Sequence, residues 1–176
     1  MAISLYDISV ATYDQVLGGV TTFLEKGAAH CNENNIDLGD IVETRLYADM
    51  LPFRFQIVSV AHHSLGAIKG IEAGKFSPPD ADSDLDYAGL QNLITETHNE
   101  IKTIQRETVE GFEGKEVLFQ IGDRELPFTA ENFVMSFSLP NLYFHAATAY
   151  DMLRMKGTPI GKRHYMGRLR MNMQDG

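Results

Sequence analysis

The sequence predicts an all-α protein built as a four-helix bundle, with one small β-hairpin between the third and fourth helices. Four long segments carry apolar residues every three or four positions, which is the pattern of an amphipathic helix. Ordinary loops join the first three segments, and two short alternating segments precede the fourth. The sequence contains no internal repeat, so residues 1–176 are expected to form a single domain.

The first helix is expected over residues 4–32, where the apolar side chains keep a helical spacing. Gly18 and Gly19 lie in its middle, and each glycine costs about 1 kcal/mol relative to alanine. We expect the close approach of a neighbouring backbone to offset this cost. Residues 33–40 are rich in Asn, Asp and Gly, which indicates a loop, and a short helical turn is expected after it.

The second helix is expected to begin with Asp49 as its N-cap and to end at Gly70 or Gly74. Pro52 is tolerated in the first turn because its missing N–H needs no partner there. Residues 75–89 are polar and contain proline, so the sequence predicts a loop without strand or helix.

The third helix is expected over residues 90–108, which have the clearest helical period of the chain. Residues 115–121 and 124–129 flank the pair Gly122 and Asp123. This arrangement is typical of a β-hairpin in which glycine supplies the positive φ of a tight turn. Two strands alone are marginally stable, so the hairpin is expected to pack on the helices.

The fourth helix is expected over residues 130–156, with Thr129 as its N-cap and Gly157 after its end. It is apolar on nearly all sides, as a central helix of a bundle would be. Pro140 lies inside it and is expected to kink it, since proline removes a helical hydrogen bond.

Composition narrows the classes of function. The chain carries 24 acidic and 15 basic residues, for a net charge of −9, which argues against a nucleic-acid groove. No apolar run approaches the roughly 18 residues of a membrane span. Cys31 is the single cysteine, so no intrachain disulfide forms and a cytoplasmic protein is expected. The acidic segment from Asp80 to Asp86 lacks the glycine and glutamate of an EF-hand and is interpreted as a solvated loop.

The histidines are the strongest candidates for chemistry. His62 and His63 fall on the second helix and His145 on the fourth, and Asn141 shares a helix face with His145. Metal sites in bundles use side chains of facing helices, so His63, His145 and Asn141 are candidate ligands of zinc or nickel, with His62 as the alternative to His63. The competing interpretation has no metal, because a histidine on an apolar helix is more often a core residue and asparagine is a poorer ligand.

Basic residues gather after the fourth helix. Among them, Lys162 and Arg163 follow Gly161 and could receive an anion or the carboxylate of a thiol cofactor. Alternatively, they cover the bundle or complement the acidic surface across a dimer interface. The second interpretation is favoured, since exposed charges contribute little beyond solvation and weak pairing.

Three segments carry the most specific motifs of the chain: DMLPF with Gln56 in residues 49–56, PNxxFH in residues 140–145, and GxxxGKxxxxG in residues 157–167. Together they resemble a bacterial family of unknown function within the DinB/YfiT-like metalloenzymes, over nearly the whole chain. The resemblance implies a four-helix bundle in an up-down-down-up arrangement that is usually dimeric, so a homodimer is expected.

The resemblance also implies a place for the chemistry. DinB-like proteins of known activity resemble metal-dependent thiol transferases and a thiol-dependent isomerase, and hold a divalent ion with one histidine of helix two and an HxxxH pair of the last helix. Here His145 matches the second histidine of the pair, Asn141 replaces the first, and His62 or His63 lies near the helix-two position. Because one imidazole is lost, the resemblance implies a weak or degenerate site for a small electrophile or thiol. The alternative is a non-catalytic homodimer that binds a small molecule or partner.

Overall fold

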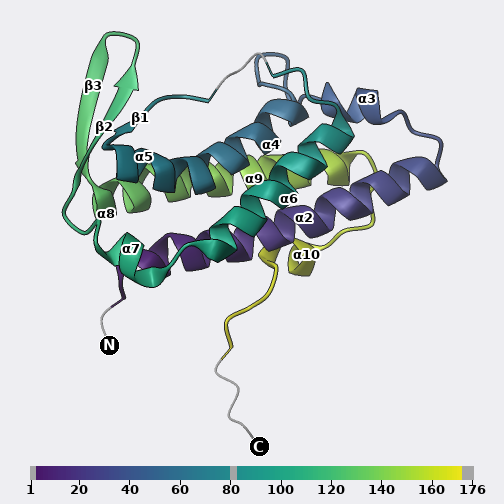
Figure 1. The fold of residues 1–176 in the computed structure, drawn as a ribbon. Coiled ribbons are helices and arrows are strands. Elements are labelled where there is room, and N and C mark those ends of the chain that lie inside the picture. Colours follow the sequence, from purple (N-terminus) through teal and green to yellow (C-terminus); the bar gives the residue numbers. More distant parts are fainter. Residues whose placement is uncertain (1–2, 80–82, 172–176) are drawn as a thin grey trace, which may run out of the picture.

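The computed structural model describes residues 3–79 and 83–171, which form a mostly helical molecule with a small sheet at one end (Figure 1). The strands are β1 Lys75–Phe76, β2 Glu116–Ile121 and β3 Arg124–Thr129. The helices, in which η marks a π-helical segment, are α1 Leu5–Ile8, α2 Val10–Glu33, α3 Leu38–Val42, α4 Phe53–Ala61, η1 His62–Gly66, α5 Ala67–Ala73, α6 Tyr87–Thr103, α7 Arg106–Glu110, α8 Ala130–Phe133, η2 Val134–Ser138, α9 Leu139–Met155 and α10 Lys162–Met166.

The long helices pack side by side. α2 lies along α6 and α4 along α9, while α4 also contacts α6 and α2 also contacts α9 (Figure 1). The shared core is apolar and includes fully buried side chains from all four, such as Phe23, Ile57, Ile94 and Leu142. In the described part of the chain, no helix is both long and apolar enough to cross a membrane.

The helix predicted over residues 4–32 is interrupted near its start. α1 and α2 meet at Ser9, whose φ of −103° and ψ of −89° lie outside the helical region. The Ser9 hydroxyl donates to the Leu5 carbonyl at 2.6 Å, one of the local bonds through which serine competes with helix hydrogen bonding. α2 then runs to Glu33 without a further break.

The expectation that a neighbouring backbone approaches the glycine pair is confirmed at Gly19. A Cβ placed on Gly19 would lie 2.2 Å from the Tyr165 carbonyl oxygen and 3.1 Å from that of His164. On Gly18 it would meet only the His98 ring, at 3.5 Å. Glycine is therefore required at position 19 by the packing of α10 on α2, and position 18 has room for a methyl group.

The predicted start of the second helix at Asp49 is wrong. Pro52 is the N-cap residue, and α4 begins with Phe53. The Phe53 N–H donates to the Thr44 carbonyl at 2.8 Å. A neighbouring loop therefore supplies the hydrogen-bond acceptor that a capping carboxylate would otherwise provide at the start of the helix. At the other end, α5 stops before Gly74, which adopts φ +73° and is one of the two predicted stops.

The loop predicted over residues 75–89 contains regular structure at both ends. Its first two residues form β1, which pairs in parallel with β2. At its end, Asp86 caps α6 by accepting a hydrogen bond from the Gly89 N–H at 2.7 Å. A strand of two residues is too short for any periodicity to predict. Residues 80–82 of the acidic segment lie outside the described residues.

The sheet has three strands in the order β1-β2-β3, so it is larger than the predicted hairpin. β2 and β3 are antiparallel, with Ile121 opposite Arg124 and Gly122 at φ +57° between them. β2 turns Val117 and Phe119 into the core, which anchors the sheet on the helices. The third predicted helix is also divided, because α6 ends at Thr103 and α7 follows separately.

The fourth predicted helix begins at Thr129, whose hydroxyl accepts a hydrogen bond from the Asn132 N–H at 3.3 Å. Its end precedes Gly157, at φ +90°. Between these points the helix widens into the π-helical η2, and Pro140 lies two residues beyond its end. Proline lacks an N–H and its ring clashes with a carbonyl of the preceding turn in a regular α-helix, so the wider turn lies where proline needs room.

Candidate functional site

A buried chain of hydrogen bonds joins the two π-helical segments. The Ser138 hydroxyl of η2 donates to the His63 carbonyl of η1 at 2.7 Å. Because this bond uses its only proton, the Ser138 oxygen accepts from the Tyr13 hydroxyl of α2, also at 2.7 Å. Tyr13 and Ser138 are fully buried. Residues of α2 and η2 therefore fix the backbone of η1, and π turns are rare features that are frequently found at functional sites.

The His63 side chain lies in an aromatic pocket. The rings of Phe76 and Phe137 are centred 5.7 Å and 5.6 Å from it, and only 4% of the residue is exposed. Within the described residues, its Nδ1 atom is buried and has no hydrogen-bond partner. Burial, with repulsion from His62 and His145, lowers the pKa of His63 to about 3. The imidazole is therefore neutral near pH 7, which is the form that binds metals.

His145 faces His63 from α9. The two rings are nearly parallel, with an angle of 10° and centres 5.8 Å apart. Its Nδ1 atom lies 2.7 Å from Gln56 Oε1, and the Gln56 amide nitrogen donates to the Leu51 carbonyl at 2.9 Å. Since the amide oxygen can only accept, His145 Nδ1 carries the proton and Nε2 keeps a free lone pair. Burial lowers the pKa of His145 to about 4.

The His62 ring also lies close to that of His63, with centres 5.4 Å apart and an angle of 84° between the rings. Its Nε2 atom donates to the Ser77 carbonyl at 2.7 Å, and its ring packs on Phe76 at 4.4 Å between centres. Burial lowers the pKa of His62 as well. Of the two candidates from the second helix, it is His63 whose ring the structure pairs with His145.

Asn141 is turned toward its own helix. Its amide nitrogen donates to the Phe137 carbonyl, one turn earlier, at 2.7 Å. This leaves Oδ1 as the only atom of the side chain that could reach an ion. Across residues 3–79 and 83–171, no group of three or more His, Cys, Asp and Glu side chains is placed to hold a metal. The donors brought together are thus the two imidazoles of His63 and His145.

These two imidazoles are ligands of the right type for a divalent ion, but they are fewer than such an ion usually has. Neutral imidazole is a good ligand of zinc and nickel, and the hydrogen bond from His145 to Gln56 is the kind of outer contact that orients a ligating histidine. Catalytic zinc sites ordinarily have three protein ligands, however. The two imidazoles therefore suit an ion held weakly, with most coordination positions open.

Sequence reasoning missed Gln56, Ser138 and Tyr13 as parts of this site. The sequence did carry a signal for Gln56, since this residue precedes His63 by two helical turns on the same face and belongs to the motif in residues 49–56. No sequence signal pointed to Ser138 or Tyr13, because they are linked to His63 by hydrogen bonds between segments that are distant in the sequence.

Lys162 and Arg163 lie elsewhere. They begin α10, which packs on α2 (Figure 1). The two histidines instead lie where η1 meets α9. Both basic residues are exposed. The described structure therefore does not bring the predicted anion contacts to the predicted metal ligands.

The lowered pKa values predict an acid-sensitive fold. Free histidine has a pKa of about 6.5, so the unfolded chain takes up protons at His63 and His145 well before the folded chain does. Their contribution to the free energy of unfolding is complete above about pH 6.5 and is lost as the pH falls toward 4. In urea unfolding with a chelator, His145→Gln should lose less stability between pH 7.5 and 4.5 than the wild type does. His30→Gln, outside the site, should behave as the wild type, and an unchanged loss in His145→Gln would contradict the account.

Comparisons with known proteins bear on the fold. The family described as "Domain of unknown function (DUF1993)" matches residues 5–166. No curated protein matches the chain. Among solved structures, a DinB family member from Shewanella denitrificans is similar over 97% of this chain and 96% of its own, with a TM-score of 0.79 and 21% identity. At this identity the likeness establishes the fold alone.

Proposed function

Because the chain belongs to the DUF1993 family and shares the fold of a DinB family member, we propose that it is a DinB-like protein in which His63 and His145 bind one divalent ion weakly. In this proposal α2, α4 to α5, α6 and α8 to α9 form an up-down-down-up bundle, with β2 and β3 as the hairpin between the third and fourth helices. The proposal also includes a homodimer, which the resemblance to the family implies, and a cytoplasmic location, which the single cysteine favours.

One observation carries the proposal. The rings of two neutral imidazoles from different helices lie nearly parallel with their centres 5.8 Å apart, and Gln56 accepts the Nδ1 proton of one of them, so that its Nε2 atom keeps an unprotonated lone pair. A second feature supports it: the buried Nδ1 atom of His63 has no partner in the described structure. Leaving such an atom unpaired costs about 1–3 kcal/mol, so native structures seldom do so without a use for it.

Each residue then has a role. His145 and His63 hold zinc or nickel, and Asn141 can add its Oδ1 atom as a third ligand or contact a ligand of the ion. When bound, a divalent ion supplies Lewis-acid chemistry to a small electrophile or thiol at its open positions. Gln56 keeps His145 in the required tautomer, and Phe76 and Phe137 keep water from His63.

A second candidate function is a non-catalytic homodimer that binds a small molecule or partner beside His145. It is favoured by the apolar side chains that the site leaves open: Phe144 is 57% exposed with its ring 5.2 Å from that of His145, and Leu51 is 41% exposed. In this case the pair of His145 and Gln56 is a structural hydrogen bond. Unfolding curves with and without a chelator should then coincide.

Calorimetric titration of tag-free, chelator-treated protein with zinc and nickel tests the proposal. We expect binding to the wild type, binding about 10- to 100-fold weaker in Gln56→Leu, because the orienting contact is lost, and a larger loss in His63→Ala. His62→Gln is the matched control, since its ring is tied to Ser77 and should not contribute. Equal affinities of His62→Gln and His63→Ala would count against the site.

A further inference from the structure

The segment containing α10 is fastened tightly to α2. The Gln15 side-chain amide donates to the Met166 carbonyl at 2.9 Å, and the Tyr165 carbonyl rests on Gly19. Gly167 adopts φ +62°, and a Cβ there would lie 2.4 Å from the Gln15 carbonyl oxygen. Close backbone contacts on both sides thus fix the chain as it leaves α10, and the side chains that it carries have a defined place.

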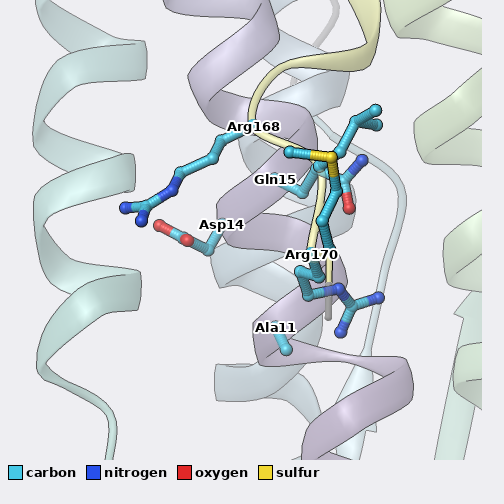
Figure 2. Close-up of a pocket in the computed structure, with 7 residues that line it drawn as sticks. Ala11, Asp14, Gln15, Arg168 and Arg170 are labelled. Atoms are coloured by element: carbon cyan, nitrogen blue, oxygen red, sulfur yellow. The ribbon is translucent and has the colours of Figure 1, made fainter. Parts of the chain in front are cut away.

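Two cavities open between this segment and α2. One, of about 470 Å³, is lined by Gly18, Thr22, Arg163, His164, Gly167 and Arg168. The ionisable side chains among these lining residues are all basic. The other, of about 540 Å³, shares Arg168 and adds Arg170, Asp14 and Gln15 (Figure 2). Figure 2 shows Arg168 extended beside Asp14, and the Asp14 carboxylate accepts a hydrogen bond from His98 Nε2 at 2.9 Å.

His164 presents a hydrogen-bond donor on this side of the molecule. The Gly161 N–H donates to His164 Nδ1 at 2.9 Å, so that nitrogen is an acceptor and the ring proton of the neutral form resides on Nε2. The Thr22 hydroxyl is directed to its own helix, where it donates to the Gly18 carbonyl at 2.9 Å. The charged or polar donor groups carried by the residues that line the smaller cavity are therefore the guanidinium groups of Arg163 and Arg168 and the imidazole N–H of His164.

We propose that the smaller cavity binds the oxyanion of a small molecule, a phosphate or a carboxylate group. Guanidinium groups pair with such anions through two parallel hydrogen bonds, and an imidazole N–H adds a third donor group. Among the described residues that line the two cavities, the one carboxylate is that of Asp14, which belongs to the larger cavity and accepts a hydrogen bond from His98. The sequence directed attention to Lys162 and Arg163, but Lys162 is not among the lining residues, and His164 and Arg168 take its place. The inference is independent of the proposed metal site.

Titration with inorganic phosphate and, separately, with acetate tests this site, followed through the backbone amide signals in NMR spectra. We expect saturable shifts at Gly18 and at residues 161–168, and affinity at least about tenfold lower in Arg163→Gln and in Arg168→Gln. The matched control is Arg124→Gln on β3, an exposed arginine whose loss changes the net charge equally.

Saturable binding of phosphate alone assigns the site to a phosphate-bearing ligand, and binding of both anions extends it to carboxylates. The proposal is overturned if neither anion gives saturable shifts at these residues, or if Arg124→Gln weakens binding as much as Arg168→Gln does. Because Arg163 and Arg168 are exposed, the variants should remain folded, which urea unfolding checks.

Discussion

Gly19→Ala is expected to lower the free energy of unfolding by about 2 kcal/mol or more, although alanine inside a helix is ordinarily about 1 kcal/mol better than glycine. The new Cβ would lie 2.2 Å from the Tyr165 carbonyl oxygen and 3.1 Å from the His164 carbonyl oxygen. Both are backbone atoms, which cannot rotate away as the end of a side chain can. α10 must then move off α2, and the hydrogen bond from Gln15 to Met166 is strained or lost.

Gly18→Ala is the matched control, one residue away on the same helix. Its Cβ would meet His98 at 3.5 Å, which is an ordinary van der Waals contact. We therefore expect a neutral effect or a gain of up to about 1 kcal/mol from helix propensity. Urea unfolding of the two variants measures the difference. Equal stabilities would show that α10 does not pack on α2 as described.

Ser138→Ala is expected to lower the free energy of unfolding by about 2–4 kcal/mol. Its hydroxyl is the single link between the His63 carbonyl and the Tyr13 hydroxyl, and its loss strands both groups in the core. Each buried polar group left without a partner costs about 1–3 kcal/mol. The methyl group of alanine fits the space without strain, so the loss reports the hydrogen bonds and not the packing.

Tyr13→Phe should lower the free energy of unfolding by less than Ser138→Ala does, because the hydrogen bond from Ser138 to the His63 carbonyl is kept. In the double variant Tyr13→Phe/Ser138→Ala the tyrosine hydroxyl is no longer stranded, so its total should fall below the sum of the two single losses. Denaturant unfolding of the four proteins completes the cycle. Strictly additive losses would mean that the three groups do not act as one chain of hydrogen bonds.

Local chemistry predicted much of the helical fold. Apolar periodicity located the long helices, and Thr129 and Gly157 marked the start and end of the last of them, as observed. The start of α4 was misplaced because Asp49 is a good capping residue in isolation, whereas Thr44 supplies the hydrogen bond in the folded chain. Breaks such as Ser9 and strands as short as β1 depend on tertiary packing and leave no periodic signal.

The candidate site could be predicted only in outline. Helical spacing favoured His63 over His62, and the structure pairs His63 with His145. The π turns could not be foreseen, because an extra residue in a turn depends on contacts with another helix, here through Ser138. The contact between Gln56 and His145 is likewise set by the packing of α4 on α9.

The central claim is that His63 and His145 together hold one divalent ion. Equilibrium dialysis of tag-free wild type and His145→Ala against zinc and against nickel, followed by elemental analysis, measures it most directly. We expect the wild type to retain close to one ion per chain at saturation and His145→Ala to retain much less at every concentration of free metal. The same metal content in both proteins, or none in either, would contradict it.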